Sequence, residues 1–182
     1  TSFTYTYDPY GNVLTEKESG VDNKWLQKNY SYSNGILTGT TYSSQTETIL
    51  SENYTYANRH LKTVKLGNTT IWDLQAADVF GHPTKIVTGN ITRNYTYNLY
   101  GFPTGRTASS TLGGTFLNSS YSFNSVNGNL NFRKDLTRNL IENFEYDSMN
   151  RLTGYENTTI SYSNLGNILS KSDAGTLGYD GY

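Results

Sequence analysis

The sequence predicts an all-β fold of consecutive antiparallel β-hairpins, joined into one long, twisted and curling sheet. Only five of the 182 residues are Ala, which argues against a helical protein, whereas Thr, Ser, Asn and Tyr are abundant. Short Tyr-rich runs recur along the chain, and an Asp or Asn and a Gly follow most of them as a turn signal. Disorder is disfavoured, because the net charge is only −1 and 14% of the residues are aromatic.

The clearest hairpin spans residues 4–15, with the sequence TYTYDPYGNVLT. Side chains alternate along a strand, so Tyr5 and Tyr7 share one face. Asp8 and Gly11 mark the first and last positions of a type I turn, because Asp bonds its own backbone and Gly accepts the last position. The residues after Gly11 carry Val, Leu and Thr and form the return strand.

The same pattern recurs in seven further copies of varying turn length. They cover residues 30–38, 54–61, 78–84, 94–104, 121–130, 144–153 and 161–170. A ninth copy begins at Tyr179–Asp180. We therefore predict that residues 1–182 form one array of about eight hairpins plus a truncated ninth, as a segment of a larger protein. The predicted structural residues of the turns are Asp8, Gly11, Gly35, Asp78, Gly81, Asn98, Gly101, Gly128, Asp147, Asn150 and Gly166.

Polar links separate the hairpins. Two examples are residues 43–46 and 108–114, and their variable length suggests that they have little structural role. Residues 135–143 permit a helix, but this stretch is short and contains two Asn, which favours an extended or irregular link.

The runs at residues 7–15 and 146–153 fit the pattern Tyr-Asp-x-x-Gly-Arg/Asn-Leu-Thr, with Asn150 in the Gly position of the second. This pattern resembles the YD repeat of the bacterial Rhs family and is equally similar to the repeats of insecticidal toxin-complex shells, wall-associated proteins and teneurins. The resemblance implies a strip of hairpins wound into a hollow spiral shell. In toxin members such a shell encloses an effector, and in teneurin-like members it serves adhesion.

The chain departs from the family pattern in having no recognisable effector and no autoproteolytic Gly- and Asp-rich motif. The resemblance therefore implies a non-catalytic structural segment of a large secreted or cell-surface protein, of the polymorphic-toxin type. The implied partners are flanking repeats of the same chain and an encapsulated polypeptide. Self-association through unpaired strand edges is also expected.

The tyrosines leave an alternative open. If they face outward, aromatic rings flanked by Asn and Asp suit a glycan or a receptor, and Tyr5, Tyr7, Tyr95 and Tyr97 are the candidate ligand-facing residues. The favoured interpretation is that they pack between hairpins, because the composition offers little other core material.

Most chemical functions find no support in the sequence. The chain has no Cys, and its two histidines, His60 and His82, lack metal-ligand spacing. Carboxylates such as Asp8, Asp78 and Asp147 recur at the turn position, which indicates turn capping, and a calcium site built from turn side chains is the less favoured alternative. The net charge gives no basic surface for nucleic acid, and no apolar run is long enough for a membrane-spanning helix. We expect no cofactor.

Overall fold

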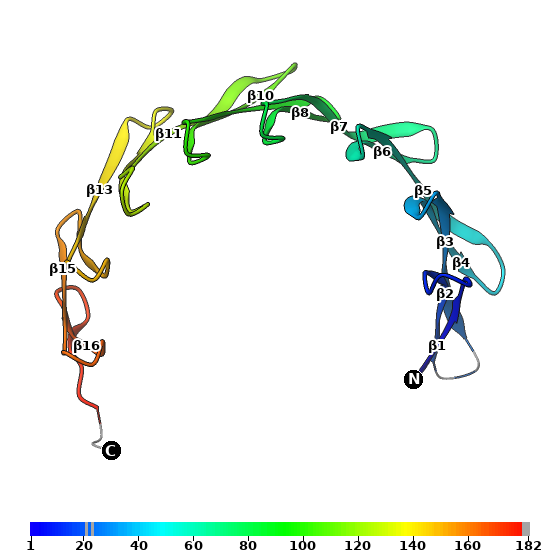
Figure 1. Cartoon of the computed structure of the whole chain (residues 1–182), viewed down its shortest axis with the longest axis horizontal. Coiled ribbons are helices and arrows are strands. Elements are labelled where there is room, and N and C mark those ends of the chain that lie inside the picture. The colour runs from blue at the N-terminus through cyan, green and yellow to red at the C-terminus, as the bar shows by residue number, and fades with distance from the viewer. Residues whose placement is uncertain (21, 23, 180–182) are drawn as a thin grey trace. The chain divides into compact units, whose positions relative to one another are not determined.

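The computed structural model describes residues 1–20, 22 and 24–179, and these residues contain 17 β-strands and no α-helix (Figure 1). The strands form one open antiparallel sheet, so the all-β hairpin prediction is confirmed. The first eight strands are β1 (Ser2–Tyr7), β2 (Val13–Ser19), β3 (Trp25–Ser33), β4 (Ile36–Ser44), β5 (Thr48–Ala57), β6 (His60–Leu66), β7 (Thr69–Ala77) and β8 (Pro83–Thr88). The others are β9 (Ile91–Tyr97), β10 (Pro103–Ser110), β11 (Gly114–Phe123), β12 (Leu130–Asp135), β13 (Leu140–Tyr146), β14 (Leu152–Tyr155), β15 (Thr158–Tyr162), β16 (Ile168–Lys171) and β17 (Gly175–Thr176).

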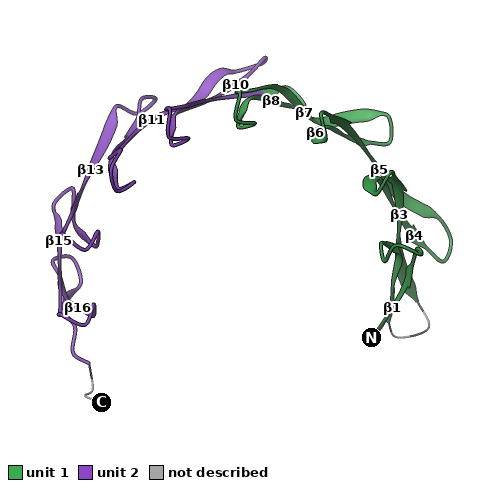
Figure 2. Ribbon diagram, in the orientation of Figure 1, with its two compact units in different colours: residues 1–91 green, residues 92–182 purple. Residues whose placement is uncertain are grey.

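The chain divides into two units, Thr1–Ile91 and Thr92–Tyr182, which Figure 2 colours separately. In the first unit every strand from β1 to β7 pairs antiparallel with the strand that follows it. In the second unit the same holds from β9 to β17. Within a unit, successive turns therefore lie at alternate ends of the strands, and the Asp/Asn–Gly turns share one end.

The hairpins repeat one irregularity of register. A β-bulge lies one or two strand pairs before the turn, for example between Thr6 and Tyr7 and between Ser161 and Tyr162. The same shift occurs before Tyr32, Tyr56, Ala77, Phe123 and Tyr146. A bulge re-aims the side chain beside it and increases the local twist. In most hairpins that side chain is the second aromatic residue of the repeat.

Little of the described chain is fully covered by other residues. Among the described residues only Gly39, Thr40, Ala108 and Gly154 are buried, with exposures of 4% at Thr40 and 5% at Ala108, because one sheet layer has no second layer to pack against. Hydroxyl pairs across the hairpins add support between neighbouring strands. They join Thr6 to Thr15 (2.7 Å), Thr55 to Thr63 (2.6 Å), Thr96 to Thr104 (2.9 Å) and Ser161 to Ser170 (2.6 Å).

The expectation that the polar links have little structural role is wrong. Ser43 and Ser44 end β4, and Ser43 pairs with Thr48 of β5. Ala108, in the second link, pairs with Leu117 and is one of the four buried residues of the described chain. Backbone ladders need no hydrophobic alternation, which explains why these Ser- and Thr-rich segments gave no strand signal.

The prediction against a helix at residues 135–143 is confirmed. Strand β12 ends at Asp135, β13 begins at Leu140, and a turn joins them. The ninth copy lies partly outside the described residues, since Tyr179 is described and Asp180 is not.

Candidate functional site

Five turns at the Asp/Asn–Gly end of the hairpins share one backbone construction. In the first of them the N–H of Asp8 donates to the Asn12 carbonyl (2.9 Å), and the N–H of Gly11 donates to the Asp8 carbonyl (3.1 Å). The same two bonds close the turns that begin at Asp78, Asn98, Asp147 and Ser163. Each unit therefore presents nearly identical corners at one end of its hairpins, and these corners are the main candidate for a functional surface.

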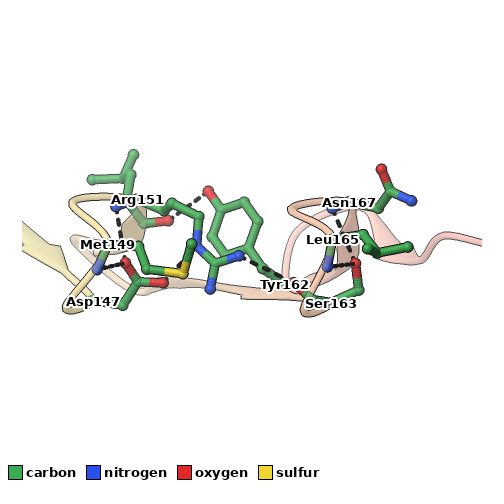
Figure 3. A network of polar contacts seen from close by, with 8 residues as sticks. Asp147, Met149, Arg151, Tyr162, Ser163, Leu165 and Asn167 are labelled. Atoms are coloured by element: carbon green, nitrogen blue, oxygen red, sulfur yellow. Dashed lines mark hydrogen bonds and ion pairs between the residues drawn. The ribbon is translucent and has the colours of Figure 1, made fainter.

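The first side chain of each turn caps the backbone inside it. One carboxylate oxygen of Asp8, Oδ1, accepts the N–H groups of Tyr10 (2.9 Å) and Asn12 (2.8 Å). Oδ1 of Asp147 accepts those of Met149 (2.9 Å) and Arg151 (3.0 Å) in the same way, as Figure 3 shows. Asp78, Asn98 and Ser163 make the equivalent pair of bonds. These bonds satisfy N–H groups that the strand ladder does not reach.

The fourth residue of each of these turns has a positive φ. The values are +87° at Gly11, +88° at Gly81, +81° at Gly101, +61° at Asn150 and +90° at Gly166. Gly35 (+73°) follows Asn34 in a two-residue turn, and Gly128 (+76°) ends a longer turn that begins at Asn124. All eleven residues named as turn positions from the sequence thus lie in turns. Asn is the non-Gly residue best suited to this region, which accounts for Asn150.

The capping carboxylates are stabilised in their charged form. The Asn12 side-chain amide, aided by backbone N–H groups, lowers the pKa of Asp8. The backbone N–H of Arg151 and then its guanidinium lower the pKa of Asp147. At Asp78 desolvation raises the pKa, but bonds from His82 and the turn backbone outweigh it and the net direction is downward.

In the turn at residues 147–151 the fifth residue contacts the next repeat. Arg151 donates from Nε to Asp147 Oδ2 (2.7 Å) within its own turn and from a terminal nitrogen to the Ser163 carbonyl (3.1 Å) of the following turn. Its guanidinium carbon also lies 4.6 Å from the ring centroid of Tyr162, the second aromatic of the next repeat (Figure 3). A cation over an aromatic face is an attractive arrangement. Arg151 therefore joins two successive turns.

A second junction in the same unit uses two aromatic rings in these positions. Phe102, the fifth residue of its turn, stacks on Phe123, with ring centroids 5.1 Å apart and planes 17° from parallel. A Cβ at Gly128 would lie 3.3 Å from Cζ of Phe102, so the next turn also approaches this ring closely. The fifth turn residue and the second aromatic of the next repeat thus form a recurrent contact, which sequence reasoning missed.

Tyrosine hydroxyls form a further link between repeats. Tyr32 donates to the Val13 carbonyl (3.0 Å), Tyr56 to the Leu37 carbonyl (2.7 Å) and Tyr162 to the Leu152 carbonyl (2.8 Å). In each case the acceptor pairs, in the ladder, with the second aromatic of the preceding repeat, which is Tyr7, Tyr32 or Tyr146. A half-buried phenol needs a hydrogen-bond partner for its hydroxyl. The sequence could therefore have indicated that these tyrosines form such bonds, but not which carbonyls accept them.

The first tyrosine of the pair binds glutamate in the first unit. Tyr30 donates to Glu16 Oε2 (2.9 Å), and Lys28 Nζ lies 3.2 Å from Glu16 Oε1. Desolvation and the Glu16 charge raise the pKa of Tyr30 to about 12, while the bonds from Tyr30 and Lys28 lower that of Glu16. Tyr54 makes a similar bond to Glu52 (2.6 Å). These carboxylates hold phenols in place and so add to the stiffness of the sheet face.

The four tyrosines named as candidate ligand-facing residues differ in exposure. Tyr5 and Tyr7 of β1 are 47% and 58% exposed, whereas Tyr95 and Tyr97 of β9 are half-buried. The two pairs lie on separate strands in different units. Binding through them stays a prediction.

The histidines take part in turn structure. His82 Nδ1 lies 2.8 Å from Asp78 Oδ2, and His60 begins β6. Across residues 1–20, 22 and 24–179, no three His, Asp or Glu side chains gather as a metal ion would require. The described part of the chain also has no helix that could cross a membrane.

The comparisons with known proteins give structural matches only. No family model and no curated protein match the sequence. The fold is similar to part of a chain in the Tc holotoxin pore of Photorhabdus luminescens, with a TM-score of 0.71 and 13% identity, over 94% of this chain and 11% of that chain. A chain in a complex of TcdB2, TccC3 and Cdc42 aligns over 93% of this chain and 14% of that chain, at 12% identity, but with a TM-score of 0.27. This chain therefore spans only 11% and 14% of the length of the two matched chains, and at this identity the first match shows a shared fold.

Proposed function

We propose that this chain is a non-catalytic wall segment of a secreted bacterial Rhs/YD-repeat protein of the toxin-complex type. The observation that carries the proposal is that successive hairpins are bound to one another through one recurrent set of contacts. A fold shared with part of a toxin chain supports it. In this role the repeats make a stiff sheet that encloses or displays another polypeptide, and the chain contributes no chemistry of its own.

The turn tips support assembly with other parts of such a shell. Turns in soluble proteins usually expose polar residues, but the third turn residue here is repeatedly large and apolar. The exposed fractions are 91% at Tyr10, 69% at Phe80, 67% at Tyr100, 63% at Met149 and 91% at Leu165. Since these residues sit at one end of the hairpins in each unit, they form apolar rows suited to contact with a neighbouring surface.

Electron microscopy of the natural protein that contains residues 1–182 tests the proposal, with an antibody fragment bound to this segment as a marker. We expect the marker on the wall of a hollow shell. A marker on a free-standing arm, with no enclosed volume behind it, would contradict the wall function.

A glycan- or receptor-binding module is the alternative, and the exposure of Tyr5 and Tyr7 is the observation that favours it. Calorimetric titration with candidate glycans separates the two functions. Saturable binding that is lost in Tyr5→Ala and Tyr7→Ala would favour the module.

A further inference from the structure

The repeat that ends with the β7/β8 hairpin lacks the aromatic ring that the other repeats carry. Ala77 follows the bulge and pairs with Pro83, as Tyr56 pairs with Leu61 and Tyr162 pairs with Ile168. The aromatic residues at the equivalent positions are half-buried, except at the first strand, whereas Ala77 is exposed. The backbone of the repeat is therefore present without the aromatic side chain that stands at this position elsewhere.

A hollow of about 670 Å³ lies at this junction. Its walls include His60, Leu61, Trp72, Ala77 and Phe80, so it spans the space between two successive turns. His60 directly follows a two-residue turn whose residues, Asn58 and Arg59, both have positive φ. It thus corresponds to Arg151 and Phe102, the residues that contact the next aromatic ring in their own junctions.

The other repeats indicate what fits in this hollow. In three of them a phenol enters the junction and its hydroxyl donates to a backbone carbonyl of the preceding hairpin. The acceptor is the residue paired with the preceding second aromatic, and here that residue is Leu61, the partner of Tyr56. Leu61 lines the hollow, and so does Lys62, whose ammonium group is held by Asp73 (3.0 Å).

We propose that this hollow binds a tyrosine side chain of another polypeptide, in the place that Tyr162 fills in its own repeat. The ring lies beside His60 and Trp72, and the hydroxyl donates to the Leu61 carbonyl. The site goes beyond the wall function and does not depend on it, since the chain's own junctions specify the ligand. The geometry calls for a phenol rather than a phenyl group.

The test is an NMR titration of the full chain with N-acetyltyrosinamide, read at the indole N–H signals of Trp72 and Trp25. We expect a saturable shift at Trp72 with a dissociation constant on the order of 1 mM, typical of so small a ligand. Trp25 serves as the internal control, and its signal should stay in place. No saturable shift at Trp72, or an equal shift at both, would overturn the proposal.

A ligand without the hydroxyl and a variant with a phenol built into the chain test the hydroxyl contact and the location of the site. N-acetylphenylalaninamide should bind several-fold more weakly, and equal binding would overturn the hydroxyl contact with Leu61. Ala77→Tyr places a phenol in the hollow from within the chain, so we expect it to abolish the shift at Trp72 and to raise Tm by roughly 2–4 °C. The matched control is Ser31→Tyr, an exposed strand position in another hairpin, which should leave binding unchanged.

If Ala77→Tyr fails to fold, the unmodified chain still locates the ligand. Nuclear Overhauser contacts between the ligand ring and the Trp72 indole, measured on the unmodified chain, locate the ligand without any substitution. Contacts confined to other residues would overturn the site.

Discussion

Two junctions of the same design differ in one side chain. Between the turns at residues 147–151 and 163–167, Tyr162 lies under Arg151 and bonds to Leu152. Between the turns at residues 58–59 and 78–82, Ala77 stands in the equivalent place and a hollow remains. The bulge precedes both residues, and both following turns are capped in the same way. The turn and bulge thus form from local sequence, while the aromatic contact between repeats is a separate source of stability.

That separation explains how a sheet with almost no buried core can hold together. An isolated hairpin is marginal in water, and the recurrent bonds of the turns are all local. The contacts that cross from one hairpin to the next are the ladder bonds, the phenol-to-carbonyl bonds and the ring contacts. In a repeat array, stability is a sum of such nearest-neighbour terms.

Removing the aromatic contact in the filled junction should have the largest effect. Tyr162→Ala loses a half-buried ring and its hydrogen bond, so we expect the free energy of unfolding to fall by about 2–3 kcal/mol. Urea unfolding followed by circular dichroism measures it. Tyr162→Phe, the matched control, keeps the ring and should lose only about 1 kcal/mol. A loss of only a few tenths in Tyr162→Ala would mean that the filled junction is no stronger than the empty one.

Strain in the turn should have the next largest effect. Gly166 has a φ of +90° and no atom within 4 Å of the place where a Cβ would stand. Gly166→Ala therefore tests backbone conformation alone, and we expect a loss of about 1–2 kcal/mol in the free energy of unfolding. Gly113→Ala is the control, because that position is equally open and its φ is not positive. Equal melting temperatures for the two variants would contradict the claim that the positive φ at Gly166 makes an Ala destabilising there.

The smallest expected effect concerns pH. Asp147 has a pKa below the ordinary value of 3.8, because Arg151 and the turn backbone bind the carboxylate. Its contribution to stability is therefore complete above the pKa of the unfolded chain and is lost as the pH falls through the lower folded value. In Asp147→Asn, which copies the cap that Asn98 provides in its own turn, stability should fall less steeply below about pH 4. Thermal melts between pH 2.5 and 6 measure the difference, and identical profiles for variant and wild type would contradict this role for Asp147.

The hairpins and their corners could be predicted from the sequence because their signals are local. Asp8 and Gly11 lie three residues apart, and that spacing alone specifies the turn. The links could not be predicted as strands, since Ser43 and Ala108 belong to segments without hydrophobic alternation. Their strand structure comes from ladder bonds to a neighbouring hairpin.

The contacts between repeats could not be predicted either. Arg151 meets Tyr162 after 11 residues, whereas Phe102 meets Phe123 after 21, so no fixed spacing marks the pair. Only the register of the intervening strands brings the two positions together. The sequence shows that the repeat at residues 78–84 has no Tyr before its turn. That a hollow lies beside Ala77 could be seen only in the three-dimensional structure.

A double-mutant cycle on Arg151 and Tyr162 tests most directly whether neighbouring repeats stabilise each other. Arg151→Ala, Tyr162→Ala and the double variant are compared with the wild type by urea unfolding. We expect a favourable coupling of about 0.5–1.5 kcal/mol between these two residues of different repeats. A coupling of zero, with the two losses simply additive, would contradict it.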